Sequence, residues 1–187
     1  MNIGLGIATL SNPRLIERLV FRPYDYARNR NRHTIILSAF AHADLPHLLF
    51  NMVTFWYFGV PLEGRIGTVM FVLLYMAGLL LSQYGSYRKH RADPAYATLG
   101  ASGAISAVLF AYIVYWPTHS LYMFFIPLPI PAPLFGVLYL AYTIWSARQS
   151  RDRINHDAHL GGALTGLAFV AIFDPSAYAR AWALVAG

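Results

Sequence analysis

Five stretches of this sequence contain no Asp, Glu, Lys or Arg and consist mostly of apolar residues. A helix crosses the hydrocarbon core of a bilayer with about 20 apolar residues, so these stretches predict membrane-spanning helices. Only 12% of the 187 residues are charged, whereas a soluble domain is about a quarter charged. The predicted fold class is therefore an all-α polytopic membrane protein. The five stretches are residues 45–62, 68–86, 98–116, 134–147 and 158–173.

We expect one membrane-embedded domain, because 187 residues are enough for a single domain with a sizeable core. Residues 1–10 are apolar but too few to span a bilayer. The last apolar stretch is short, which indicates a buried position or a locally thinner bilayer. The predicted parts of residues 1–187 are an N-terminal stub with a basic first loop (1–44), a helical core (45–175) and a short interfacial tail (176–187).

Two segments outside the apolar stretches carry local signals. Residues 11–34 hold six arginines and predict a segment at the level of the lipid headgroups. Asn12 before Pro13 predicts the start of a short helix over 13–21, because Asn caps helices and Pro suits the first helical position. Four alternating prolines exclude a helix within residues 121–133, which we expect to form an irregular interfacial loop. These prolines are Pro127, Pro129, Pro131 and Pro133.

The cysteine content and the net charge exclude several kinds of chemistry and partner. The chain has no cysteine, so disulfides, thiol nucleophiles and Cys-ligated metals are excluded. Its net charge of +6 bears on membrane orientation and anionic lipid rather than on nucleic acid. We therefore expect the lipid bilayer, and no nucleic acid, among the partners.

A serine flanked by glycines lies near the start of the third apolar stretch. Gly100 and Gly103 remove side-chain bulk beside Ser102, so other backbones can approach its hydroxyl. The first N–H groups of a helix lack intrahelical partners and carry partial positive charge, which favours an oxyanion there. Small residues also pack membrane helices together, and for an isolated G-x-S-G motif this explanation is the stronger one.

Two polar residues lie one helical turn apart at the start of the first apolar stretch. His47 and Asn51 are four residues apart and therefore share a face of the helix. Both side chains can donate hydrogen bonds toward one point. Polar residues within a membrane span usually face a cavity or a partner. An interhelical hydrogen bond that holds two helices together explains the pair equally well.

The last apolar stretch begins with a histidine followed by small residues. Gly162 and Gly166 share a helical face with His159, and such a face lets another helix approach closely. If that helix begins at Ser102, His159 could take the proton of the hydroxyl and deliver it to a leaving amine. For His159 alone, a hydrogen-bonded polar residue at a helix end is the better explanation.

The order of the spans brings these residues to one side of the membrane. The first, third and fifth apolar stretches are separated by even numbers of crossings, so their N-terminal ends lie at the same face. The serine, the histidine and the two potential oxyanion donors are therefore expected at one depth.

In combination these motifs resemble the rhomboid family of intramembrane serine proteases. The chain contains H-x4-H-L-L-F-N at residues 42–51, G-A-S-G at 100–103 and A-H-L-G-G-A-L-T-G at 158–166, in the family's order and spacing. The segment I-P-L-P-I-P-A-P-L-F-G at 126–136 precedes a helix, as in that fold. The resemblance covers about residues 11–175, and the combination is specific although each motif alone is weak.

The resemblance implies a Ser–His dyad without a triad carboxylate, and without a metal or another cofactor. Ser102 would be the nucleophile and His159 the general base. His47 and Asn51 would donate to the oxyanion together with the Ser102 backbone N–H. The implied substrates are single-pass or other membrane proteins cleaved near one membrane face, and water must reach the dyad through a polar cavity. The residues implied to pack helices at the site are Gly100, Gly103, Gly162 and Gly166.

The chain departs from the family pattern at three places. Relatives begin with a full membrane helix before the basic loop, of which residues 1–10 are at most the end. Many relatives carry Trp-Arg where this chain has His33 and Thr34, so the anchoring of the first loop is expected to differ. Many also have an aromatic residue four positions after the serine, stacked on the catalytic histidine. Here that position is Ser106, so another residue must hold the histidine.

Charge and family resemblance predict opposite orientations. The first loop, residues 87–97 and residues 148–157 share one face and carry twelve of the fourteen Lys and Arg residues. The positive-inside rule places that face in the cytoplasm, whereas bacterial members of the family usually open their site outward. Both orientations stay open for this multi-pass integral membrane protein, which we expect in the cell inner membrane if the chain is bacterial.

Three other functions agree with parts of the pattern. A catalytically impaired rhomboid-like factor that binds membrane proteins is the main alternative, although such proteins usually lose the serine or the histidine. A histidine metal site lacks an H-E-x-x-H motif and a carboxylate within the spans. Ala104 breaks the G-x-S-x-G elbow of soluble α/β-hydrolases, and no strand precedes the serine. The histidines of the metal hypothesis are His42, His47, His156 and His159.

Overall fold

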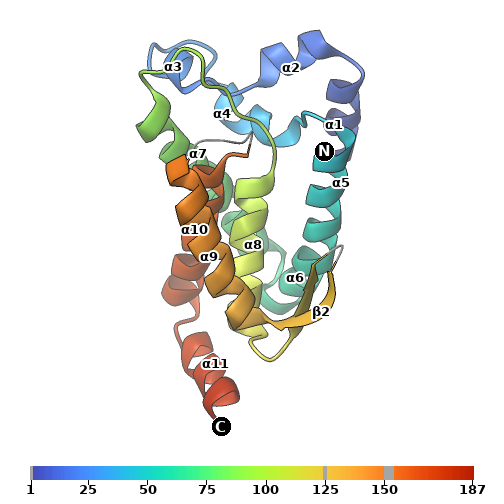
Figure 1. The fold of residues 1–187 in the computed structure, drawn as a ribbon, viewed down its shortest axis with the longest axis vertical. Coiled ribbons are helices and arrows are strands. Elements are labelled where there is room, and N and C mark those ends of the chain that lie inside the picture. The colour runs from blue at the N-terminus through green and yellow to red at the C-terminus, as the bar shows by residue number, and fades with distance from the viewer. Residues whose placement is uncertain (1, 124–125, 150–153) are drawn as a thin grey trace.

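In the computed structural model, which describes residues 2–123, 126–149 and 154–187, most of the chain is helical. The long helices run side by side, and short N-terminal helices cover one end of the bundle (Figure 1). The helices are α1 (Asn2–Leu10), α2 (Pro13–Leu19), α3 (Pro23–Tyr26), α4 (Thr34–Leu37), α5 (Leu45–Thr54), α6 (Val60–Ile66), α7 (Thr68–His90), α8 (Ser102–Tyr115), α9 (Ala132–Gln149), α10 (His156–Phe173) and α11 (Ser176–Ala186). The strands are β1 (Ser120–Met123) and β2 (Ile126–Pro131), a 3-10 turn covers Ser38–Phe40, and a π-helical turn (Phe55–Gly59) joins α5 to α6.

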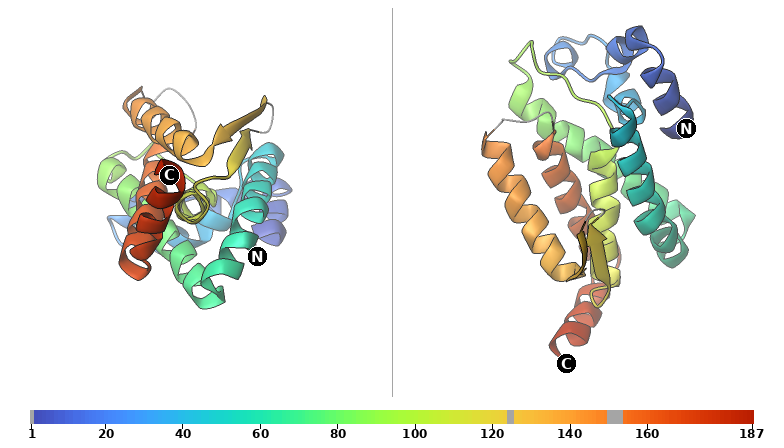
Figure 2. Two further views of the ribbon diagram at one scale, coloured as in Figure 1. Left: turned by 90° about the horizontal axis from the view of Figure 1, so that it is seen from below. Right: turned by 45° about the vertical axis from the view of Figure 1, so that its right-hand side comes forward.

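Helix α8 lies at the centre of the bundle, where other parts of the chain cover its apolar sequence. Every residue from Gly103 to Val114 is buried. A helix without a polar face is covered by protein or by lipid, and α8 is covered by protein. Seen along the bundle, the other long helices surround α8 (Figure 2). Ser102 is therefore the first residue of the most enclosed helix of the protein.

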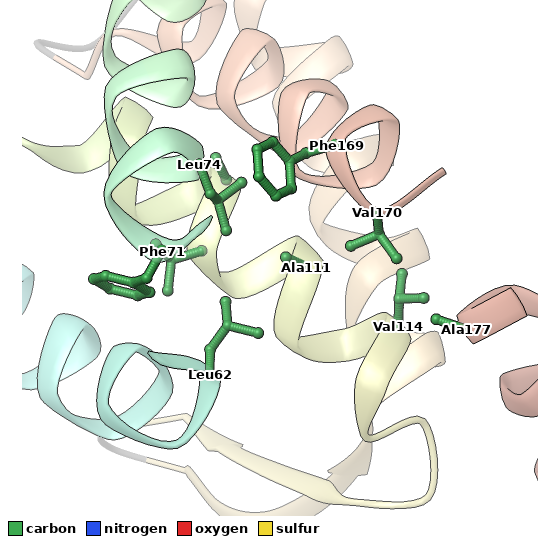
Figure 3. Close-up of a cluster of buried hydrophobic side chains, with 10 residues drawn as sticks. Leu62, Phe71, Leu74, Ala111, Val114, Phe169, Val170 and Ala177 are labelled. Carbon is green, nitrogen blue, oxygen red and sulfur yellow. The ribbon is translucent and has the colours of Figure 1, made fainter. Parts of the chain in front are cut away.

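The main apolar cluster joins α6, α7, α8, α10 and α11, from the middle of α8 to the end farther from Ser102 (Figure 3). In a membrane, lipid is as apolar as these side chains, so close packing holds the helices together rather than removal from water. Aromatic rings and small side chains interdigitate in this cluster, which lets the helices pack closely. The buried members are Leu62, Phe71, Leu74, Ala107, Val108, Ala111, Val114, Phe169, Val170 and Ala177.

Glycines let the backbones of α7, α8 and α10 approach closely. A methyl group on Gly162 would overlap the carbonyl oxygen of Gly103, and one on Gly166 would overlap that of Ala107. On another side of α8, a methyl group on Gly78 of α7 would lie 2.6 Å from the Ala107 Cβ atom. The predicted G-x-x-x-G face of the last helix therefore packs on α8.

Large apolar side chains cover the outer faces of the long helices. A continuous surface of this kind indicates contact with lipid or with another protein. Among the described residues, α7 alone is long and apolar enough to cross a membrane, and α10 with α11 makes a second candidate that is bent by 107°. The other predicted spans stay predictions. Exposed residues of α7 and α9 include Val69, Val72, Leu73, Leu81, Val137, Leu138 and Trp145.

The N-terminal segment bears out one local prediction. The Asn12 side chain accepts a hydrogen bond from the Arg14 N–H at 3.1 Å, and Pro13 is the first residue of α2. The predicted helix start is therefore confirmed. Helix α2 ends at Leu19 rather than at residue 21, because Phe21 leaves the helix to pair with Thr98.

The prediction of an irregular loop over residues 121–133 is wrong. Strands β1 and β2 form an antiparallel hairpin with Ser120 opposite Pro131, so the fold is not purely α-helical. Alternate residues of a strand direct their N–H groups to opposite edges, and the Ala132 N–H bonds to the His119 carbonyl across the hairpin. Pro129 and Pro131 therefore lie with their nitrogen toward the open edge, where a missing N–H removes no ladder hydrogen bond, whereas Pro133 lies in the first turn of α9.

Helix boundaries also differ from the predicted spans. Helix α8 begins at Ser102 rather than at residue 98, because the preceding residues pair with the first loop. Helix α10 begins at His156, two residues before the predicted start, because Asn155 caps it. The first span is interrupted by the π-helical turn but continues to Ile66.

We predict that Gly162→Ala and Gly166→Ala each lower the free energy of unfolding by about 1–3 kcal/mol, because an added methyl group overpacks a rigid backbone contact. Thermal denaturation in detergent measures the effect. Gly64→Ala is the matched control, since nothing lies within 4 Å of the added methyl group. A control as unstable as the two variants would show that the helix contact is not the cause.

Candidate active site

Ser102 is the first residue of α8, where the backbone changes from extended to helical. Gly100 has φ +109°, a conformation that L side chains rarely adopt, and it allows the turn into the helix. The first N–H groups of α8 have no partner within the helix. The Ser102 side chain is partly buried. This geometry presents backbone donors beside a hydroxyl, as expected from the sequence.

The segment before Ser102 is held by the first loop. Thr98 and Phe21 exchange backbone hydrogen bonds at 2.9 and 3.0 Å, and Phe21 is fully buried. The Gly100 N–H donates to the Ser38 carbonyl at 2.9 Å. These bonds fix the direction in which the chain enters α8, so the position of the serine depends on the N-terminal segment.

Asn155 ties the start of α10 to the same segment. Its side-chain oxygen accepts from the Ala158 N–H, which caps α10. Its side-chain nitrogen donates to Thr98 Oγ1 at 2.9 Å and to Ser86 Oγ at 2.8 Å. One amide therefore joins α7, α10 and the chain that leads into α8.

His47 and Asn51 lie on α5, and His47 packs against the turn at Gly100. A methyl group on Gly100 would lie 2.7 Å from His47 Nε2, so the imidazole ring contacts the backbone two residues before Ser102. Asn51 is 2% exposed, and its side-chain nitrogen has no hydrogen-bond partner among the described residues. A buried donor without a partner is costly, and it is common where a ligand supplies the acceptor.

His159 lies in the first turn of α10, against the first turn of α8. The two turns touch at Ala158, whose carbonyl oxygen would lie 3.3 Å from a methyl group on Gly103, and Gly162 of the next turn packs on the Gly103 carbonyl. The His159 ring is partly buried. It lies 6.3 Å from the Tyr139 ring of α9, centroid to centroid, and 6.0 Å from the His156 ring.

Asp157 does not face the histidine of the proposed dyad. Its carboxylate accepts from Lys89 Nζ at 2.9 Å and lies 3.4 Å from His90 Nε2. Lys89 Nζ also donates to the Ala147 carbonyl at the end of α9. The carboxylate therefore links α10 to α7, as expected from its position two residues before His159.

A small polar cavity lies beside Ser102. Its volume of about 10 Å³ is enough for roughly one water molecule. Gln83 lines it, and the Gln83 side-chain oxygen is buried without a partner among the described residues. The other polar lining residues are Ser82, Thr98, Ser102 and Asn155.

The four histidines of the metal hypothesis form two separate close pairs. His42 and His47 are 5.1 Å apart, centroid to centroid, and His156 and His159 are 6.0 Å apart. Within residues 2–123, 126–149 and 154–187, no three His, Asp or Glu side chains are gathered as a metal site requires.

The family model of the rhomboid domain matches residues 29–176, which include Ser102, His159, His47 and Asn51. The chain belongs to the rhomboid family. That family consists of membrane proteins, which agrees with the apolar outer surface of the bundle.

Three curated relatives illustrate the similarity, and the chain spans less than half the length of each of them. The chain is 32% identical over 155 residues to RHOMBOID-like protein 12, mitochondrial, of Arabidopsis thaliana, covering 74% of this chain and 46% of that protein. It is 33% identical over 164 residues to Rhomboid protein 1, mitochondrial, of Saccharomyces cerevisiae, covering 83% and 45%. It is 31% identical over 146 residues to the human presenilin-associated rhomboid-like protein, mitochondrial, covering 73% and 36%.

Sequence reasoning missed three residues that this rhomboid fold brings to the site. Asn155 was detectable as an N-cap, because Asn before a helix is a common start signal. Gln83 was detectable as a polar residue within an apolar span. Tyr139 carries no such signal, because an aromatic residue on an apolar helix usually packs in a core or against lipid.

We predict that His42 makes stability depend on pH. The side chain is fully buried, and neither ring nitrogen has a hydrogen-bond partner within the described part of the chain. Burial and the neighbouring His47 lower the pKa of His42 to about 4. The unfolded chain takes up this proton near pH 6.5, so stability is lost as the pH falls from about 6.5 toward 4.

The melting temperature in detergent, measured between pH 7 and pH 5, tests this dependence. His42→Gln should reduce the slope, because the substituted side chain does not titrate. His33→Gln is the matched control, since His33 is exposed. An unchanged slope in His42→Gln would contradict the prediction.

Proposed function

We propose that this chain is an intramembrane serine endopeptidase that cleaves membrane-protein substrates with a Ser102–His159 dyad. The contact between the first turns of α8 and α10 is the observation that carries the proposal. It brings the turn of a histidine against the turn of a serine, and the nearby α5 carries the buried Asn51 nitrogen, which has no hydrogen-bond partner among the described residues. Membership of the rhomboid family supports the same reaction class.

In the proposed reaction, Ser102 Oγ attacks the carbonyl carbon of the scissile peptide bond while His159 takes the hydroxyl proton. Negative charge develops on the carbonyl oxygen. The Asn51 side-chain N–H, the His47 ring and the Ser102 backbone N–H donate to it. His159 then gives its proton to the leaving amine, and an acyl-enzyme on Ser102 remains.

Water completes the proposed reaction. His159 takes a proton from a water molecule whose oxygen attacks the acyl carbon. The bond between that carbon and Ser102 Oγ then breaks, His159 returns the proton to Oγ, and the carboxylic acid product leaves. The bundle surface is apolar, so a store of water near the serine is needed. The polar cavity beside Ser102, with the unpartnered Gln83 oxygen, supports this role.

The proposed substrates are single-pass or other membrane proteins, recognised at the end of the bundle where the basic loops lie. A helix exposes no carbonyl for attack until it unwinds, so segments with small or helix-breaking residues are the expected substrates. We propose a multi-pass membrane location. The three relatives are named as mitochondrial, so they give no support to a bacterial inner membrane.

We predict that a fluorescent fluorophosphonate labels the detergent-solubilised chain, and that Ser102→Ala and His159→Ala abolish labelling. The probe reports a serine that a base has activated. Ser11→Ala and His33→Ala are matched controls at exposed positions and should label like the unaltered chain. A cooperative melt shows that each variant is folded.

Two results would overturn the protease proposal. One is labelling or substrate cleavage that persists in both Ser102→Ala and His159→Ala. The other is an unlabelled but folded chain, which would favour the alternative of a catalytically impaired factor that binds membrane proteins. An uncut membrane protein that copurifies with the chain would support that alternative.

Asn51→Ala tests the oxyanion donor separately. We predict that kcat for a membrane substrate falls by about 10²–10³-fold, the usual effect of removing one such donor, while KM changes little. Thr54→Ala, which removes the next polar side chain of α5, should leave kcat near the unaltered value. A loss that appears in KM alone would assign Asn51 to substrate binding instead.

A further inference from the structure

Tyr139 of α9 reaches both helices that carry the proposed dyad. Its hydroxyl lies 2.8 Å from Ser106 Oγ on α8. Its ring lies 6.3 Å from the His159 ring on α10, with an angle of 23° between the planes. Offset, nearly parallel rings at this separation attract each other.

The contact of Tyr139 with His159 is one of two similar ring contacts between the antiparallel helices α9 and α10. Tyr139 and Tyr142 are three residues apart on α9, and His156 and His159 are three residues apart on α10. Tyr142 meets His156 edge to face at 5.5 Å, one turn from the contact of Tyr139 with His159. Residues three apart share a helix face, so the register of the two helices sets both contacts.

Ser106 holds the tyrosine in place. It is buried one turn after Ser102 on α8, at a point where Gly162 of α10 also packs. A buried hydroxyl group needs a hydrogen-bond partner, and Ser106 and Tyr139 supply one to each other. Phe110 packs against the Tyr139 ring at 5.4 Å and limits its rotation further.

We propose that Tyr139 is the positioning residue for His159, and that the Ser106 hydroxyl anchors it. An imidazole base must hold its ring within a fraction of an ångström of the productive geometry. In this chain the ring that stacks on the histidine comes from α9, whereas α8 contributes only a small hydrogen-bonding residue. The His156 ring, on α10 itself, meets His159 edge to face at 6.0 Å. The orientation of the base therefore depends on α9 staying packed against α8. The catalytic part of this inference rests on the proposed protease function.

The position of the ring is tested first without any activity measurement. In chain labelled with ¹³C and ¹⁵N at histidine and held in detergent, NMR reports the ring-proton shifts of His159, assigned with His159→Ala. The ring current of Tyr139 should displace these shifts. Tyr139→Leu should remove the displacement, Tyr139→Phe should keep most of it, and Tyr142→Phe should leave it unchanged.

The consequence for the dyad is tested by the rate of fluorophosphonate labelling. Tyr139→Phe and Ser106→Ala should each slow labelling by roughly three- to thirty-fold, the range expected for coupled contacts. The double variant should be no slower than the slower single variant, because both remove one hydrogen bond. Tyr139→Leu should be at least as slow, and Tyr142→Phe is the matched control. With a membrane substrate, the loss should fall on kcat and leave KM unchanged.

The outcomes separate this inference from the protease proposal. If His159 shifts do not respond to Tyr139→Leu, the positioning role is wrong whatever the activity. If they respond in a folded chain that no probe labels, the contact exists and the protease proposal is wrong. If the labelling losses of Tyr139→Phe and Ser106→Ala multiply in the double variant, the two residues do not act through one hydrogen bond, and the anchoring role is wrong.

Discussion

The close approach of α10 to α8 is the constraint on which the rest of the structure depends. Two glycines of α10 rest on backbone carbonyls of α8, at Gly103 and at Ala107, so no side chain separates the helices there. In an apolar environment such packing replaces the removal of apolar surface from water as the source of cohesion. The same contact sets the distance between the turn of Ser102 and the turn of His159. Stability of the bundle and geometry of the proposed dyad therefore have one physical cause.

Polar groups gather at the end of the bundle where this contact begins. Most of them satisfy one another, as Asn155 does by bonding to α7, to α10 and to the segment before α8. Several buried polar atoms at this end have no hydrogen-bond partner among the described residues, among them the Asn51 nitrogen, the Gln83 oxygen and both ring nitrogens of His42. Buried polar groups are costly when unpaired. The Gln83 oxygen lines the cavity beside Ser102, which supports the proposal of a water there, and Asn51 follows His47 by one turn on α5, which supports its proposed role at the oxyanion.

Much of the fold and of the proposed site was predictable from the sequence, because the signals are local. Uncharged stretches predicted the helices, Asn12 predicted a helix start, and the spacing of Gly162 and Gly166 predicted a close helix contact. The hairpin was missed because alternating prolines exclude a helix but suit the open edge of a strand, and only pairing with β1 decides between loop and strand. The number of membrane crossings stays a prediction, since α7 alone among the described helices is long and apolar enough by itself.

The sequence by itself determined that the chain is mostly helical, that its composition is of the membrane type and that it belongs to the rhomboid family. These conclusions depend on apolar patterns and short motifs, which are properties of neighbouring residues. It also predicted that Ser106 leaves the histidine without the usual ring. Only the tertiary structure decided which residue takes that place. Tyr139 lies 33 residues from Ser106 and 20 from His159 in the chain, and the register between α9 and α10 brings the three together. That register comes from side-chain packing across three helices, and no local pattern in the sequence encodes it.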